Sequence, residues 1–195
     1  YLGAPDQLDK KLVIRELKPV LEDINIKKVG QNIKFDMSIL HQHGIHLKGI
    51  SHDTMLESYV IDSVATRHDM DSLAQKYLEI KTASFTDVVG KGAKQITFDQ
   101  VEIDQATDYA AEDADVTLKL HETLWPRIQS DSNLAFVFEQ IEVPLISVLS
   151  RIERKGALID SDLLFEQSSE LAVKLSSIEQ EAWHQAGEEF NLSSP

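Results

Sequence analysis

The sequence has 195 residues, 42% of them hydrophobic, which is enough for one full domain and part of a second. It contains no cysteine, which excludes disulfides, thiolate metal sites and cysteine nucleophiles. It also has no apolar run long enough for a signal peptide or a membrane span. We therefore expect a cytoplasmic protein without a membrane partner. The formal net charge of −14 argues against a broad basic surface for nucleic acids, so a polyanionic ligand requires bound cations.

The first elements are predicted to be a helix, a short strand and a second helix. Residues 7–22 place leucines near helical spacing, and Pro19 is expected to end or kink that helix. Residues 27–32 form a brief apolar step that favours a strand. The second helix is expected over residues 32–43, because Asn32 is a good N-cap residue and a glycine follows the helix.

The next segment is expected to alternate between a strand and short helices. Residues 45–63 first alternate as in a strand and then change to helical spacing, with Asp53 predicted to cap the helix. Residues 70–78 favour another short helix, for which Asp71 or Ser72 is the expected cap.

A loop and a long helix complete the first predicted domain. Residues 88–97 are rich in glycine and lysine, but they lack the spacing of a phosphate-binding P-loop. Residues 104–125 are rich in Ala, Leu and Glu and predict the longest helix, with Pro126 expected to end it. The polar residues 126–133 indicate a domain border.

Two long helices are expected after that border. The first covers about residues 134–155 and ends at Gly156, and the second covers about residues 161–186. The predicted domains are therefore residues 1–126 and 127–195. The fold class is expected to be α/β and helix-dominated.

One carboxylate in the second predicted helix stands out. Ile33, Met37 and Leu40 form an apolar stripe on this helix, and Asp36 stacks with Leu40 and Asn32 along its edge. The carboxylate is therefore expected to point at or near the buried side.

The longest predicted helix repeats this arrangement. Tyr109, Asp113, Val116 and Leu120 follow one line of the helix, and no lysine or arginine shares that line. An ionised carboxylate in apolar surroundings costs several kcal/mol unless a partner compensates it. With no cysteine present, a divalent cation such as Mg²⁺ or Mn²⁺ is the partner that oxygen ligands favour. The alternative from spacing alone is that both aspartates are solvated surface charges.

Several stretches resemble the 3′–5′ proofreading exonuclease domain of bacterial family A DNA polymerases, those of the DNA polymerase I type. The pattern NxxxFD is followed, after a spacer of the expected size, by YxxxD. Later stretches resemble the segment that enters the polymerase thumb. The stretches, in chain order, are 29–36, 53–78, 109–121, 141–160 and 187–194.

The resemblance implies a ribonuclease H-like fold and a two-metal nuclease that trims the 3′ end of single-stranded DNA, for proofreading in replication and repair. It implies that Asp113 binds the first Mg²⁺ or Mn²⁺ directly and that Asp36 holds the second largely through water. It also implies that Tyr109 orients the attacking water.

Five further residues are candidates for substrate binding. Gln31 and Phe35 flank the second motif, and the resemblance implies that they line the single-strand cleft, although Phe35 is equally consistent with the core. Asn32 offers an amide to a phosphate or a sugar. Arg67 lies in a loop that could reach a phosphate, or is simply solvated. Phe85 could stack on a terminal base or anchor its loop in the core.

The sequence departs from this family in one respect. The first motif of the family is an Asp-x-Glu on an early strand, and no such strand precedes Asp36 here. We therefore expect a fragment that lacks the first strands of the exonuclease sheet and half of the metal ligands. Such a fragment is expected to hydrolyse DNA poorly or not at all. It is also expected to self-associate through its incomplete sheet. The alternatives are an inactive nucleic-acid-binding domain and a helical scaffold without a site.

Overall fold

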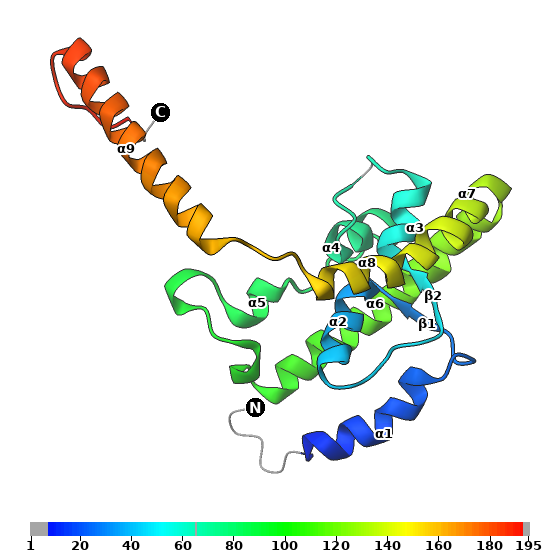
Figure 1. Ribbon diagram of the computed structural model, residues 1–195. Coiled ribbons are helices and arrows are strands. Elements are labelled where there is room, and N and C mark those ends of the chain that lie inside the picture. Colours follow the sequence, from blue (N-terminus) through cyan, green and yellow to red (C-terminus); the bar gives the residue numbers. More distant parts are fainter. Residues whose placement is uncertain (1–7, 65, 193–195) are drawn as a thin grey trace. The chain divides into compact units, whose positions relative to one another are not determined.

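The structure is a computed structural model that describes residues 8–64 and 66–192 (Figure 1). The chain divides into two compact units, with the border between Lys155 and Gly156. Helices predominate in both units, and the described residues form one sheet of two strands, in the first unit. The predicted α/β, helix-dominated class is confirmed.

The two strands are parallel. β1 (Lys28–Gly30) pairs with β2 (Ile50–Asp53), and Gly30 lies opposite Asp53 in the register. The connection between them carries helix α2 (Ile33–Gln42), as parallel strands require a crossover. A Cβ atom at Gly30 would lie 2.8 Å from the Cβ atom of Ile33, so only glycine lets the strand turn this tightly into α2.

Helix α1 (Lys10–Glu22) precedes the sheet. Asp9 caps it by accepting a hydrogen bond from the Leu12 amide at 3.0 Å. The helix continues through Pro19 and ends at Glu22, the end of the predicted range, so of the two alternatives for Pro19 an end of the helix is excluded. A proline this close to the C-terminal end removes a single backbone donor, and the remaining turn still forms.

Several short elements follow β2. They are α3 (Thr54–Ile61), α4 (Met70–Leu73), the π-helical turn η1 (Ala74–Leu78), α5 (Phe85–Val89), and the 3₁₀ turns η2 (Gly92–Lys94) and η3 (Phe98–Gln100).

The caps of the first two short helices were both predicted, one of them correctly. Asp53 caps α3, as predicted, and accepts from the Met55 amide at 2.9 Å. Helix α4 is capped by Asp69 rather than by Asp71 or Ser72. Asp69 has extended backbone angles and accepts from the Ser72 amide at 2.9 Å, whereas the two predicted residues already lie inside the helix.

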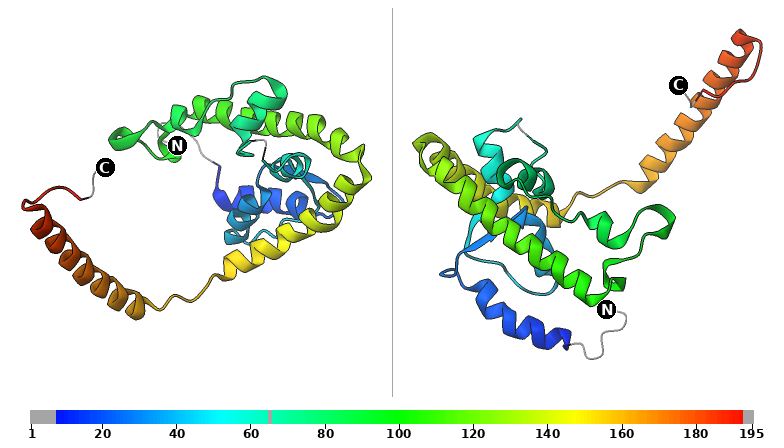
Figure 2. Two further views of the ribbon diagram at one scale, coloured as in Figure 1. Left: turned by 90° about the horizontal axis from the view of Figure 1, so that it is seen from above. Right: turned by 180° about the vertical axis from the view of Figure 1, so that it is seen from behind.

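The long helix α6 (Ile103–Gln129) forms one side of the core. It continues past Pro126 for another turn, so the expected end at that proline is wrong. Its buried residues recur every four positions and pack against α3, η1 and β1. Figure 2 shows α6 on one side of the two strands and α8 on the other. The buried seam of α6 consists of Val116, Leu120, Leu124 and Ile128.

A helix over residues 132–155 completes the first unit, close to the predicted bounds. It consists of α7 (Ser132–Val137), the π-helical turn η4 (Phe138–Glu142) and α8 (Val143–Lys155). By length and mean hydropathy it meets the criteria for a membrane span, which the sequence analysis did not expect. Glu139 and Glu142 lie at its middle, and only 11% of its apolar window is buried. Its few buried residues are Phe138, Ile146 and Ser150, and the helix contacts α2, α3 and β2, so it packs on the first unit by one face.

The second unit contains helix α9 (Ser161–Ala186). Asp160 caps it by accepting from the Leu163 amide at 3.0 Å, and Gly187 ends it with a φ of +79°. Both ends agree with the sequence prediction. The border between the compact units lies near residue 155, whereas the predicted border at residue 126 concerns functional domains and stays a prediction.

Candidate active site

Two aspartates that are far apart in the chain line one groove of about 700 Å³. Asp36 comes from the first turns of α2, and Asp113 comes from the middle of α6. Strand β1 and mostly apolar side chains form the remaining walls. The other lining residues are Leu21, Lys28, Val29, Gly30, Gln31, Ile33, Leu40, Leu47, Met70, Ala110, Ala114, Thr117 and Leu118.

Asp36 is more exposed than the sequence predicted. The residue is exposed overall, whereas the sequence analysis expected its carboxylate at or near the buried side; the carboxylate lies at the wall of the groove. The groove walls still remove enough water to raise the pKa of Asp36, and the charge of Asp53 raises it further, while a hydrogen bond to its own backbone lowers it. The neighbouring Lys34 does not compensate this charge, because its ammonium group pairs with Glu153.

Asp113 was predicted to lie on the apolar line of α6 with Val116 and Leu120, and the structure has it half-buried. Its Oδ1 atom is buried and has no hydrogen-bond partner. Burial is the largest cause that raises the pKa of Asp113, followed by the charges of Asp71 and Glu112, whereas an interaction with the Tyr109 hydroxyl lowers it. The carboxylate therefore sits among like charges, an environment that a cation would relieve.

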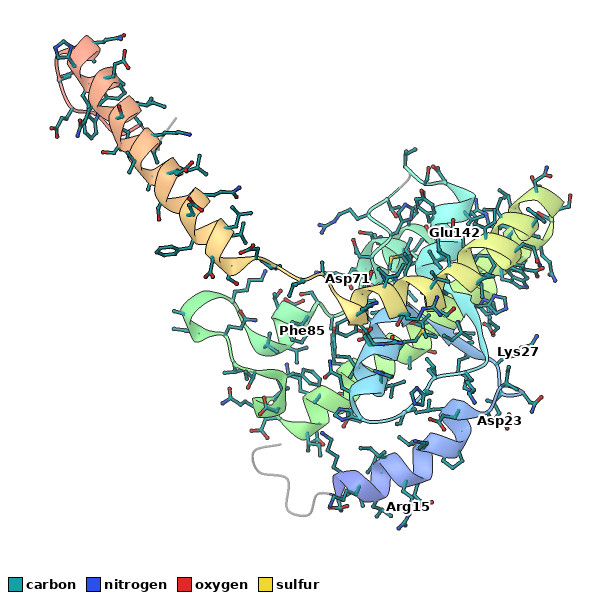
Figure 3. The ribbon with its side chains drawn as sticks, in the orientation of Figure 1. Arg15, Asp23, Lys27, Asp71, Phe85 and Glu142 are labelled. Carbon is teal, nitrogen blue, oxygen red and sulfur yellow. The ribbon has the colours of Figure 1, made fainter. Side chains whose placement is uncertain are left out.

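Asp71 and Glu112 are parts of this site that the sequence analysis missed. Asp71, labelled in Figure 3, accepts a hydrogen bond from the Thr82 hydroxyl at 2.7 Å, and Glu112 accepts from the Ala83 amide at 2.8 Å. Both acids also contribute to the raised pKa of Tyr109. Only the tertiary fold brings Asp71 to Asp113, so the local spacing carried no signal for it.

Tyr109 lies one turn before Asp113 and interacts with it, as the spacing predicted. Tyr109 is absent from the lining of the groove and instead borders a separate cavity of about 420 Å³ along the same helix. Burial and the neighbouring carboxylates, Asp113 first among them, raise the pKa of Tyr109, so the hydroxyl remains a hydrogen-bond donor at neutral pH. Phe85 and Phe98 pack near its ring, with centroids at 6.4 and 5.9 Å.

Asp53 positions α2 and therefore Asp36. Its buried carboxylate accepts hydrogen bonds from the Asn32 amide at 3.1 Å and the Ile33 amide at 2.8 Å, in addition to capping α3. One side chain thus caps two helices at once. Burial raises the pKa of Asp53, while these backbone hydrogen bonds lower it.

Of the two polar binding candidates, only Gln31 lines the groove. Its amide nitrogen donates to the His68 carbonyl at 2.9 Å, and its oxygen accepts from the Thr54 hydroxyl. Asn32 has a left-handed backbone with a φ of +55° and stands before the helix, so it does not stack over Asp36. It lines a separate cavity with Glu142.

The three remaining candidates lie outside the groove lining. Phe35 is 62% exposed, which rules out a core position and leaves its ring free to meet a base. Phe85 is 47% exposed and stacks on Phe98 with ring centroids 6.0 Å apart (Figure 3). The side chain of Arg67 is almost fully exposed and lies 3.5 Å from Asp69. Substrate binding by these three residues stays a prediction.

The groove suits a divalent cation with oxygen ligands. Lys28 is the one basic residue in its lining, and its ammonium group donates to the Asp23 carbonyl at 2.6 Å. Within the described part of the chain, neither Asp36 nor Asp113 belongs to a group of three or more close histidine or carboxylate ligand atoms. The groove therefore offers Mg²⁺ or Mn²⁺ two carboxylates, one of them with an unpartnered oxygen.

A second polar cluster lies beneath α3. The helix was predicted from the spacing of Met55, Tyr59 and Val60, but the face that it buries is polar and includes Glu57 and Ser58. Glu57 is fully buried and faces α6, so the sequence pattern identified the helix and not its buried face.

The buried Glu57 makes stability depend on pH. Burial raises its pKa from 4.5 to about 7, although the hydrogen bond from His121 opposes the shift. The folded chain thus holds this proton more tightly than the unfolded chain. The contribution of Glu57 to the free energy of unfolding is complete below pH 4.5 and falls by on the order of 3 kcal/mol as the pH rises to about 7.

Urea unfolding near pH 5 and near pH 8 measures this effect. We expect Glu57→Gln to lose clearly less stability between the two pH values than the parent chain. The matched control is Glu122→Gln, which changes an exposed glutamate on α6 and should retain the parental pH dependence. An equal loss in Glu57→Gln and in the parent would show that Glu57 is not the titrating group.

Two carboxylates that line one groove, with a tyrosine beside one of them, are consistent with a metal-dependent hydrolase, and comparison with known proteins defines the class. The model of the 3′–5′ exonuclease family matches residues 1–129. The chain belongs to this family, the exonuclease domain associated with family A DNA polymerases.

Two similar curated proteins are named DNA polymerase I. The chain is 56% identical to DNA polymerase I of Pseudomonas aeruginosa over its whole length, which is 22% of that relative. It is 43% identical to DNA polymerase I of Rhizobium leguminosarum over 98% of this chain and 19% of the relative. The chain therefore spans about a fifth of the length of these relatives.

A solved structure has the same fold. The POL domain of Pol1 from M. smegmatis, in complex with DNA primer-template and dNTP, matches with a TM-score of 0.65 and 24% identity. The match covers 93% of this chain and 28% of the other. At this identity it supports the fold alone.

Proposed function

We propose that this chain forms part of the 3′–5′ exonuclease of a DNA polymerase I-type enzyme. The activity would remove the 3′-terminal nucleotide of single-stranded DNA by hydrolysing its phosphodiester, which is proofreading during DNA replication and repair in the bacterial cytoplasm. The observation that carries the proposal is the convergence of Asp36 and Asp113 on one groove without a free basic partner.

Each site residue then has a role in this reaction. Asp113 would hold the first cation through its unpartnered oxygen, and the more exposed Asp36 would hold the second largely through water. The Tyr109 hydroxyl, which stays protonated at neutral pH, orients the attacking water by a hydrogen bond. Two divalent cations, Mg²⁺ or Mn²⁺, supply stabilisation of the charge on the attacking and leaving oxygens when bound.

The DNA end is proposed to lie along the groove. Gln31 lines it and is proposed to offer its amide to the strand. Phe35 and Phe85, whose rings are exposed outside the groove lining, are proposed to stack on bases. Asn32 and Arg67 are proposed to contact the backbone of the strand at greater distance. With a net charge of −14, the chain needs the bound cations to accept a polyanion.

The fold around the site is proposed to be a ribonuclease H-like sheet. β1 pairs only with β2 among the described residues, so its second edge is available to further strands. Such strands would carry the Asp-x-Glu carboxylates of the family, or a second copy would pair there and cause self-association. Residues 127–195 are proposed to be the start of the polymerase thumb, next to an exonuclease domain over 1–126.

Two carboxylates hold Mg²⁺ weakly, because this ion usually retains several waters. We therefore expect little exonuclease activity from the 195-residue chain alone. Fusing it to the segment that precedes the matched region in the Pseudomonas aeruginosa relative should increase Mg²⁺-dependent trimming of a single-stranded oligonucleotide by at least about a hundredfold. Equal trimming by the chain and by the fusion would contradict this expectation.

A further inference from the structure

The buried polar face of α3 meets two histidines from other elements. Glu57 lies on α3, His52 lies on β2 and His121 lies on α6, three elements that Figure 1 shows side by side. One oxygen of Glu57 is 2.7 Å from Nδ1 of His121 and 3.1 Å from Nδ1 of His52. The three side chains therefore direct their ligand atoms at one point in the first unit.

Hydrogen bonds leave this cluster incomplete. His121 bonds to Oε1 of Glu57, but Nδ1 of His52 is buried without a hydrogen-bond partner despite its short distance to the same oxygen. Oε2 of the fully buried Glu57 also has no partner. Unsatisfied buried polar atoms of this kind are costly, and two of them at one point indicate a missing ligand.

The charges around the cluster favour a cation on balance. Asp53 and Glu139 act on the cluster with negative charge, and Lys27 acts with positive charge. The ring of His52 packs against Trp125 and Phe138, with centroids at 4.6 and 5.8 Å. The apolar rings exclude water from two sides and lower the local dielectric, which strengthens the attraction of Glu57 for a cation.

We propose that His52, Glu57 and His121 form a zinc-binding site, distinct from the Asp36–Asp113 groove. Two imidazoles and one carboxylate are a donor set that Zn²⁺ takes in proteins, with a water as the fourth ligand. Hard cations such as Mg²⁺ prefer sites made of oxygen atoms, so the two sites differ in the metal they select.

The distances suit this ion after a small opening of the cluster. Zn²⁺ bonds to nitrogen and oxygen at about 2.0–2.2 Å, so tetrahedral ligand atoms stand roughly 3.4 Å apart. The three ligand atoms lie within 4.8 Å of one another, and their nitrogen–oxygen separations of 2.7 and 3.1 Å need to increase by less than about 1 Å. The bound ion joins β2, α3 and α6, so its role is to fix the packing of α3 on α6.

Zinc binding to the 195-residue chain tests the site directly. Equilibrium dialysis after EDTA treatment should give one Zn²⁺ per chain, and Mg²⁺ in large excess should not displace it. Co²⁺ in place of zinc should give visible absorption of tetrahedral intensity. Long-range ¹H–¹⁵N spectra should show Nδ1 coordination at two histidines.

Substitutions assign the ligands. His52→Phe removes Nδ1 and keeps a ring against Trp125 and Phe138, so this variant should fold. It should bind Zn²⁺ at least about a hundredfold more weakly, because loss of an outer-shell partner alone already costs about 10–100-fold in metal affinity. Glu57→Gln should weaken binding in the same way. Circular dichroism of the metal-free variants confirms that each one is folded.

Two controls separate this site from other metal-binding groups. His41 and His46 form an exposed ring pair with centroids 5.2 Å apart, and the double variant His41→Gln/His46→Gln should still bind one Zn²⁺. Asp113→Asn alters the proposed exonuclease groove and should leave the zinc affinity unchanged. The proposal is overturned if the chain takes up no zinc, or if the cluster variants retain it while the His41/His46 variant loses it.

Discussion

Replacing Asp113 with asparagine is expected to reduce 3′ trimming by at least about a hundredfold in the fusion that carries the additional carboxylates. Asparagine keeps the shape of the side chain and removes the charge that the cation requires. Because Oδ1 of Asp113 is buried and has no protein partner, the substitution breaks no hydrogen bond of that oxygen. The loss should therefore appear in activity and metal affinity, with little change in the unfolding temperature.

The matched control for this prediction is Asp115→Asn on the same helix. Asp115 is exposed and pairs with Lys119 at 2.5 Å, away from the groove lining. Exposed pairs of this kind contribute about 0–1 kcal/mol, so neither trimming nor stability should change appreciably. If both variants lose activity equally, the groove at Asp113 is not the reaction centre.

Removing the carboxylate of Asp53 is expected to destabilise the chain more than removing an ordinary cap. Asp53→Ala leaves three backbone amides without their acceptor, those of Asn32, Ile33 and Met55. Because a buried donor without a partner costs about 1–3 kcal/mol, we expect a loss of about 3 kcal/mol or more in the free energy of unfolding, measured in urea. The start of α2, and with it Asp36, should also become less ordered.

A cap at the surface provides the comparison for Asp53. Asp69 caps α4 through the Ser72 amide at 2.9 Å and is more accessible to water. Asp69→Ala should cost about 1 kcal/mol, as is typical of a single N-cap. A loss in Asp53→Ala no greater than in Asp69→Ala would show that the double cap does not hold α2 in place.

The features that sequence predicted well depend on near neighbours in the chain. Caps such as Asp53 and Asp160 lie directly before their helices, and the seam of α6 repeats every four residues. The same periodicity placed Asp113 on the line of Val116 and Leu120, and the structure has it half-buried there. Local spacing also located Asp36 on α2 at or near the buried side, and the structure has this exposed aspartate at the wall of the groove.

The features that sequence missed depend on the tertiary fold. Asn32 adopts a left-handed conformation because the Asp53 carboxylate, from another strand, binds its amide, and this moves Asn32 away from Asp36. Asp71 reaches Asp113 only after α4 packs against α6. Glu57 is buried by its contact with His121, which no apolar pattern on α3 indicates.

Paramagnetic Mn²⁺ provides the most direct test of whether Asp36 and Asp113 belong to one metal centre in the groove. In a ¹⁵N-labelled chain, small additions of Mn²⁺ should broaden the amide signals around both aspartates at the same metal concentration, and Asp113→Asn should weaken the broadening at both. Broadening around one aspartate alone, or equal broadening over the many exposed acids of the chain, would contradict a shared site in the groove.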